Sequence, residues 1–236
     1  MIPADRLAQV TSQLEAALCD HFNATIVTKE AAALHLAVAE ALDVATSVVD
    51  KVGELASFVS LDPPKLGLPT GAEYLNDFGT TIASTVALPR RWRTEASYVV
   101  TRLLVVPHEI VHVTQHQRGV DAGWWPDAVG HSVLYLCSVA TDDAAEYLGK
   151  VEADAYATTE AVRGWLSGKR RPLAEIVDSL RRHYALRPAG AMVAEADLRT
   201  HYATLDDGGI PNVTVCRWTL AWLEANAADL KGQVEA

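Results

Sequence analysis

The sequence His108-Glu109-Ile110-Val111-His112 lies in the middle of an apolar segment that is predicted to be a buried helix. Side chains four residues apart on a helix lie one above the other on the same face. His108 and His112 can therefore direct imidazole nitrogens at one metal ion, and Glu109 can take a proton from a water beside it. Two histidines and a glutamate buried without a metal would be costly.

The alternative interpretation is two capped or solvated histidines on an ordinary helix. The chain has eight histidines, and on the order of one or two in a hundred such chains would contain this motif by chance. The apolar neighbours of the motif favour metal binding, because they predict that the helix is buried.

A zinc ion bound by two histidines needs at least one more protein ligand. A helix predicted for residues 142–165 offers acids, and we select Glu152 because the small residues around it allow close approach to the motif helix. The alternative is that Glu152 is a surface acid. His116 would have to reach back over His112, so we expect it outside the ligand set. The other candidate ligands on that helix are Glu146, Asp154 and Glu160.

The residues from His108 to Gln115, followed later by Glu152-Ala153-Asp154-Ala155, resemble the gluzincin-type zincin metallopeptidases. They are most similar to small bacterial and phage families with an H-E-x-x-H-x-x-Q motif and a helical E-x-x-A motif. The resemblance covers roughly residues 80–165. It implies that His108, His112 and Glu152 bind Zn²⁺ and that Glu109 is the general base. It also implies that Gln115 supports the site, and that a strand before the motif helix pairs with extended substrate.

The sequence departs from this family pattern in two ways. Several zincin families have an aspartate four residues after the ligand glutamate, where this chain has Tyr156. No motif assigns the group that stabilises the oxyanion of the reaction, and only geometry can select it. The candidates are Tyr156, His131, His183, Tyr184, His201 and Tyr202.

The predicted fold is mainly α with a small β-sheet (α+β): a zincin-like metallopeptidase core with additional N- and C-terminal helices. Residues 1–60 are predicted to be a helical hairpin or arm, and residues 61–236 the zincin-like domain. The arm would contain a helix over 5–19 and a long helix from the N-cap Thr28 to about residue 58.

Within the zincin-like domain, residues 80–88 alternate as in a strand. A helix is predicted to begin at Thr94, to kink or restart at Pro107, and to end at Gly119. Further helices are predicted over residues 127–140, 142–165, 172–184, 188–205 and 216–230.

The net charge of −10 disfavours nucleic acid as a partner. One basic cluster, at residues 169–171 with 181–182, is predicted to be a solvated face. The three cysteines are far apart and lack C-x-x-C spacing, which indicates a reducing compartment. Without a signal pattern or a long apolar segment, the chain is expected to be soluble and cytoplasmic, with no membrane partner. Non-classical export and association with a virion remain open.

Three functional hypotheses follow. In the first, the protein is a zinc metallopeptidase that hydrolyses peptides or proteins, with Glu109 as general base. In the second, it is a non-catalytic zincin-like module whose zinc is structural or whose groove binds a protein, as in a phage or bacterial assembly. In the third, it is a helical interaction protein with an accidental motif and no metal. The N-terminal helices could bind a protein partner under each hypothesis.

Overall fold

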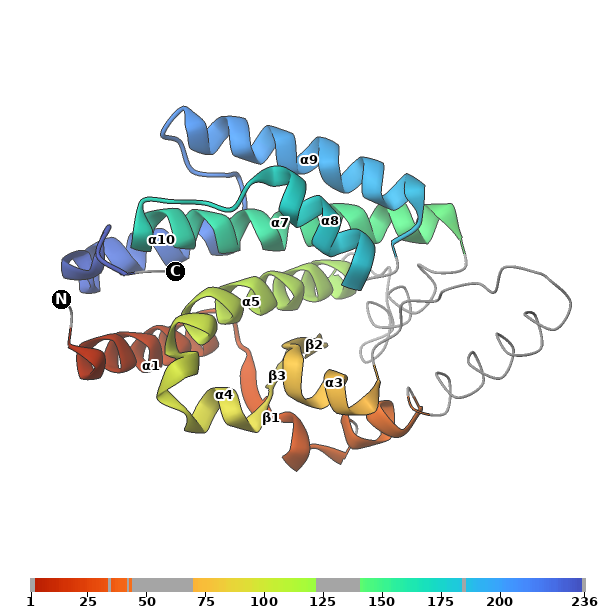
Figure 1. Cartoon of the computed structure of the whole chain (residues 1–236), viewed down its shortest axis with the longest axis horizontal. Helices are drawn as coiled ribbons and strands as arrows, with labels where there is room; N and C mark the ends of the chain where they lie inside the picture. The colour runs from red at the N-terminus through yellow and green to blue at the C-terminus, as the bar shows by residue number, and fades with distance from the viewer. Residues whose placement is uncertain are drawn as a thin grey trace, which may run out of the picture.

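The computed structural model describes residues 3–33, 35–41, 43, 70–121, 141–183 and 186–234. Two long helices, α5 (Val99–Asp121) and α7 (Asp142–Ser167), pack against each other through the middle of the molecule (Figure 1). α9 (Pro188–Asp206) packs along the other side of α7, and α1 (Ala4–His21) packs against α5. The fold of the described residues is therefore mainly α with a small β-sheet, as the sequence predicts.

The remaining helices join these layers. α10 (Thr214–Asn226) contacts α7, α5 and α1, and α8 (Leu173–His183) packs on α9. The short helices α3 (Gly71–Asp77) and α4 (Arg90–Thr94) flank the strands. Short 3₁₀ helices cover Lys29–Ala31, Ala96–Tyr98 and Ala228–Leu230.

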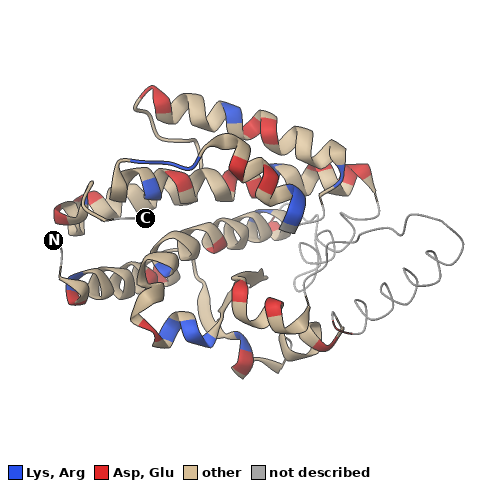
Figure 2. Cartoon of the chain, viewed as in Figure 1, with Lys and Arg blue, Asp and Glu red and all other residues tan. Residues whose placement is uncertain are grey.

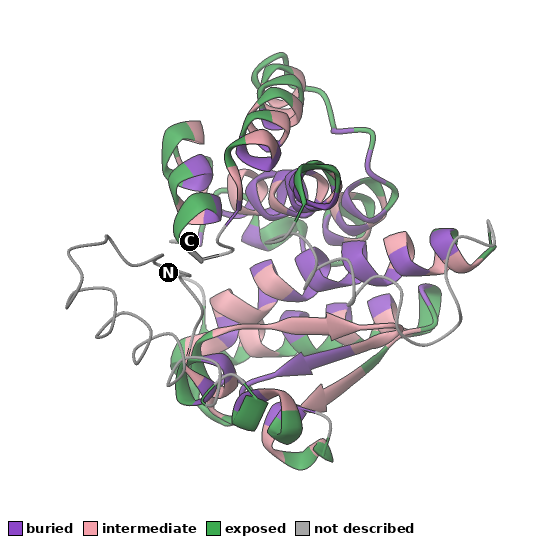
Figure 3. Cartoon of the chain, turned by 90° about the vertical axis from the view of Figure 1, so that its right-hand side faces the viewer, coloured by how far each residue is buried: buried purple, intermediate pink, exposed green. Residues whose placement is uncertain are grey.

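The sheet has three strands in the order β1-β3-β2 and lies beneath α5 (Figure 3). β1 (Thr25–Thr28) pairs parallel to β3 (Thr85–Leu88), and β2 (Thr80–Ile82) pairs antiparallel to β3. The single strand predicted over 80–88 is therefore wrong, because the chain reverses at Ala83, whose φ is +53°. β3 is central and buried, and β2 forms one edge of the sheet.

The prediction that a helix starts at Thr28 is also wrong. The β-branched residues 25–28 form β1 because they pair with β3, and a 3₁₀ turn follows them. Residues 35–41 are helical, whereas 44–58 lie outside the described residues. The predicted domain boundary near residue 61 also lies outside them.

Helix α1 shares a hydrophobic core with the motif helix. Leu14 and Leu18 of α1 belong to the same buried cluster as Leu103 and Ile110 of α5. A second buried cluster joins α7, α8 and α9. Its members include Leu148, Ile176, Leu180, Ala194 and Leu198.

α7 and α9 approach each other most closely at two glycines. A Cβ atom on Gly149 would lie 2.3 Å from the carbonyl oxygen of Gly190, and one on Gly190 would lie 2.3 Å from that of Ala145. These contacts are shorter than any side chain allows, so both positions require glycine. The two helices form a rigid layer over the motif helix.

The limits of the motif helix differ from those predicted. Thr94 ends α4, a 3₁₀ turn follows, and α5 begins at Val99. α5 then continues through Pro107 and Gly119 to Asp121, so no new helix starts at the proline.

The start of α7 is confirmed, because the Thr141 side chain accepts a hydrogen bond from the backbone N–H of Ala144. Gly168, with φ +71°, ends α7. α8, α9 and α10 confirm three further predicted helices, whereas residues 127–140 lie outside the described residues. Within the described ranges, no helix has the length and apolar character needed to span a membrane.

Candidate metal centre

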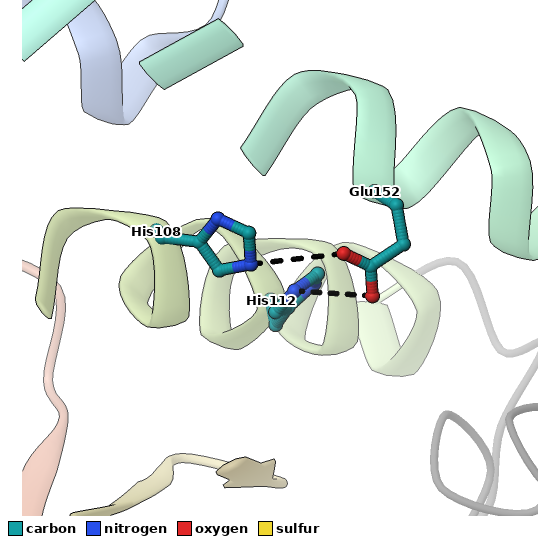
Figure 4. Close-up of side chains that lie close together, drawn as sticks. All are labelled: His108, His112 and Glu152. Atoms are coloured by element: carbon teal, nitrogen blue, oxygen red, sulfur yellow. Dashed lines mark ion pairs between the residues drawn. The ribbon is translucent and has the colours of Figure 1, made fainter. Parts of the chain in front are cut away.

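The structure brings together the two motif histidines of α5 and Glu152 of α7 (Figure 4). The His108 Nε2 atom lies 3.6 Å from Glu152 Oε2, and the His112 Nε2 atom lies 3.6 Å from Glu152 Oε1. One ligand atom from each of the three residues lies within 4.8 Å of the other two, and all three residues are buried. This group could hold a metal ion.

The helical spacing and the small residues of α7 produce this geometry. His108 and His112 are one turn apart, so both face α7. Ala153 and Ala155 next to Glu152 are fully buried, and they allow α7 to pack closely on α5. The sequence-based choice of Glu152 from four acids agrees with this arrangement.

Thr159 orients the ring of His108. The Thr159 hydroxyl donates a hydrogen bond to the backbone carbonyl of Ala155 at 3.2 Å, and its oxygen lies 3.1 Å from His108 Nδ1. A hydroxyl has one proton, so its oxygen accepts from the imidazole. We therefore assign the proton of His108 to Nδ1, which leaves the Nε2 lone pair facing Glu152.

Gln115 orients the ring of His112 in the same way. Its amide nitrogen donates to the backbone carbonyl of Val151 at 3.1 Å, which fixes the orientation of the amide. Its oxygen then accepts from His112 Nδ1 at 3.0 Å. The lone pair of His112 Nε2 thus also faces Glu152. The supporting role that the resemblance implies for Gln115 stays a prediction.

These assignments test whether the group fits a metal. The Nε2 atoms of both histidines face the Glu152 carboxylate at separations longer than a hydrogen bond. Ligand atoms about 2.1 Å from a tetrahedral zinc ion lie about 3.4 Å apart. The two nitrogen–oxygen distances of 3.6 Å, each to a different oxygen of Glu152, are close to that value, and the three ligand atoms lie within 4.8 Å of one another, so the donor types and this spacing are compatible with a metal ion.

Electrostatics favour neutral imidazole at His108. Burial lowers the pKa of His108 well below its usual value. A proton on His112 and the charge of Arg171 act in the same direction, and a hydrogen bond to the backbone of Ala155 opposes the shift. A neutral imidazole is the form that binds metals.

Glu109 lies on the side of α5 that faces the sheet, where β2 contacts this helix. The Thr81 hydroxyl lies 2.7 Å from Glu109 Oε2 and donates to it. A Cβ atom on Gly79 would lie 2.8 Å from Glu109 Oε1, so a side chain at this position would displace the carboxylate. Burial raises the pKa of Glu109, while His112, Thr81 and Lys29 oppose that rise. The role of Glu109 as general base stays a prediction.

A buried lysine follows β1 directly. Lys29 is 0% exposed, its Nζ atom donates to the backbone carbonyl of Tyr74 at 2.6 Å, and it lies 3.6 Å from the centre of the Tyr74 ring. Burial lowers the pKa of Lys29 to about 7, with the Glu109 and Glu30 carboxylates opposing the shift. Sequence reasoning missed Lys29, Thr81 and Thr159, because no motif marks them.

The candidate oxyanion stabilisers are dispersed. The Tyr156 ring packs edge-on against the His108 ring, with centroids 5.0 Å apart. His201 pairs instead with Asp154 at 3.1 Å, and the Tyr202 hydroxyl donates to the carbonyl of Arg171. His131, Tyr184 and the side chain of His183 lie outside the described residues.

No protein family, curated protein or solved structure matches this chain. The resemblance to zincins therefore depends on the motif residues alone.

Proposed function

We propose that this protein is a zinc-dependent metallopeptidase, a hydrolase in which His108, His112 and Glu152 hold Zn²⁺ and Glu109 is the general base. The observation that carries the proposal is a pair of histidines whose Nδ1 atoms contact Thr159 and Gln115 and whose Nε2 atoms both face one buried carboxylate. Glu109 is the neighbour of His108 on the same helix.

The donor set favours zinc as the metal. Two imidazoles and one carboxylate are the ligands of many catalytic zinc sites, which leave one position open, whereas structural sites prefer four protein ligands. Three such ligands converge in the part of the chain that the structure describes. When bound in such a site, zinc activates a water and polarises the scissile carbonyl.

Side chains of the protein would supply the proton transfer and the positioning of the substrate. Glu109 would take the proton of the attacking water and return it to the leaving amine. Thr81 would hold the carboxylate of Glu109 in place through its hydrogen bond to Oε2. Extended substrate would pair with the edge strand β2, as the resemblance implies, since β2 lies beside this carboxylate. Tyr156 is the described oxyanion candidate that contacts a ligand histidine.

A second candidate function is a structural metal site in a non-catalytic module. The observation in its favour is burial: His108 and His112 are each 7% exposed, Glu109 is 6% exposed and Glu152 is 1% exposed. A site that is closed to substrate in this way would stabilise the packing of α5 on α7.

Metal analysis of purified protein tests both candidates. About one zinc per chain is expected by mass spectrometry, and His112→Ala should lose it. The matched control is His116→Ala, which removes a buried histidine one turn further along α5. That variant should keep the metal. Absence of metal in the wild type, even after zinc is added back, would overturn both candidates.

Peptide hydrolysis then separates the two. The Glu109→Gln variant should keep its zinc and lose cleavage of an internally quenched peptide library. A wild-type protein that binds zinc but cleaves no peptide would favour the structural site. Equal cleavage by wild type and Glu109→Gln would contradict the assigned role of Glu109.

A further inference from the structure

The basic residues Lys169, Arg170 and Arg171 form the segment between α7 and α8, seen as a blue coil in Figure 2. They stand out in a chain whose net charge is −10. Arg170 pairs with the exposed Asp206, as expected for a solvated face. Arg171 differs, because buried groups of the protein hold it in place.

Arg171 is fixed at three points. Its backbone N–H and its Nε–H each donate to Glu160, at 2.8 Å and 2.8 Å, and the Tyr202 hydroxyl donates to its carbonyl at 2.7 Å. Glu160 is 0% exposed, and burying a carboxylate is costly unless cations compensate it. The Arg171 side chain is still 33% exposed. The result is an oriented guanidinium group that solvent and ligands can reach.

The guanidinium group lies beside the candidate metal centre. The Arg171 Cζ atom is 5.7 Å from the centre of the Tyr156 ring, and that ring packs on His108. One aromatic ring therefore separates Arg171 from a metal-binding histidine. The charge of Arg171 also contributes to the low pKa of His108, which agrees with this proximity.

We propose that Arg171 binds a carboxylate of the substrate, which makes the enzyme selective for peptides with a carboxylate near the scissile bond. This inference rests on the proposed peptidase function. Arg171 uses Nε for Glu160, and its Nη groups carry four further N–H donors for an incoming carboxylate. An extended peptide advances about 3.3 Å per residue. A peptide segment of a few residues is therefore long enough to run from the scissile bond past the ring of Tyr156 to the carboxylate that Arg171 would bind. That carboxylate belongs to an acidic side chain or to a free C-terminus.

Selectivity is measured with zinc-loaded, full-length protein and mixtures of internally quenched peptides. Each mixture has Glu fixed at one position and is compared with the same mixture carrying Gln there. A parallel set compares a free C-terminal carboxylate with an amide. Wild type should cleave one carboxylate-bearing set about tenfold faster or more, as expected for a charge-assisted hydrogen bond. The Glu and Gln arm reports a side-chain carboxylate, and the amide arm reports the C-terminus.

Arg171→Gln should abolish this preference, and the matched control is Arg163→Gln. Arg163 pairs with the same Glu160 carboxylate at 3.3 Å from within α7, so its loss perturbs the same buried charge. If Arg171→Gln does not fold, the double variant Glu160→Gln with Arg171→Gln removes the buried charge together with its partner. A second readout needs no turnover: the Kd values of labelled Glu and Gln peptides are measured on the Glu109→Gln protein, and their ratio is compared.

The outcomes separate this inference from the proposed function. Loss of the preference in Arg171→Gln, with its retention in Arg163→Gln, supports the role of Arg171. Cleavage by wild type without any preference for a carboxylate, or a preference that survives Arg171→Gln, overturns the inference alone. Absence of cleavage of every mixture by wild type overturns the proposed function and the inference together.

Discussion

Glu152 and Glu160 lie eight residues apart on the same helix and are both almost fully buried, yet their surroundings differ in kind. Glu160 is paired with the guanidinium groups of Arg163 and Arg171. Glu152 faces the Nε2 atoms of two histidines whose protons we assign to Nδ1. Arginines of the chain itself compensate the first carboxylate, whereas the second faces two histidines in a group that could hold a metal ion.

The largest expected effect is on Glu160. Glu160→Gln breaks a buried ion pair with two arginines and should lower the free energy of unfolding by about 3–5 kcal/mol. Because this carboxylate has no part in the metal group, urea denaturation should give the same loss with zinc and with a chelator. A loss that appears only in the presence of zinc would mean that Glu160 supports the metal site.

The effect of replacing Glu152 on the free energy of unfolding should depend on zinc, unlike the effect of replacing Glu160. Zinc at a hundredfold excess over its Kd should raise the free energy of unfolding of the wild type by about 2.7 kcal/mol. Glu152→Gln should lose most of that gain, because it removes a ligand. In chelator the variant should be as stable as the wild type or more stable, since a buried charge has gone. An equal gain from zinc in both proteins would exclude Glu152 as a ligand.

The residues that orient the two histidines should matter less than the ligands. Thr159→Val and Gln115→Ala should each weaken zinc binding by about ten- to a hundredfold, because partners of ligand histidines contribute to that extent. Competition with a chromophoric chelator measures the change. Thr158→Val is the matched control for Thr159→Val. Thr158 is also buried on α7, and its hydroxyl bonds the backbone carbonyl of Asp154 and the Cys216 side chain rather than a histidine of the metal group. Equal affinity in the two threonine variants would contradict the assigned His108 tautomer.

The parts of the site that the sequence predicted depend on local spacing. The pair His108 and His112 follows from one helical turn, and Glu152 follows from the small residues around it. Thr159 was not predicted, because its position against His108 depends on how α7 is rotated on α5. β1 was missed since its partner β3 lies far along the chain, and the hairpin at Ala83 was missed because a non-glycine residue adopts positive φ there.

Lys29 extends the comparison to a buried lysine, and its neighbours among the described residues include four titratable groups. The carboxylates of Glu109 and Glu30, the ring of Tyr74 and the imidazole of His35 face this cluster. Burial lowers the pKa of His35 to about 4 and raises that of Tyr74 to about 12, so neither group titrates in its folded form near pH 8. The folded-state pKa of Lys29 is about 7, against 10.5 for an unperturbed lysine.

The smallest effect we predict follows from that pKa difference. Between pH 7 and 10.5 the unfolded chain holds the Lys29 proton and the folded chain releases it, so raising the pH favours the folded state. Relative to Lys29→Met, wild type should gain up to about 1.4 kcal/mol of unfolding free energy between pH 8 and pH 9. Below pH 7 the difference between the two proteins should be constant, because both states are then protonated. Replacing the exposed Lys150 with Met should leave the pH dependence unchanged. Parallel curves of unfolding free energy against pH for wild type and Lys29→Met would mean that Lys29 keeps its proton in the folded protein. In that case the carboxylates around Lys29, Glu109 among them, compensate its charge as completely as Arg163 and Arg171 compensate the charge of Glu160.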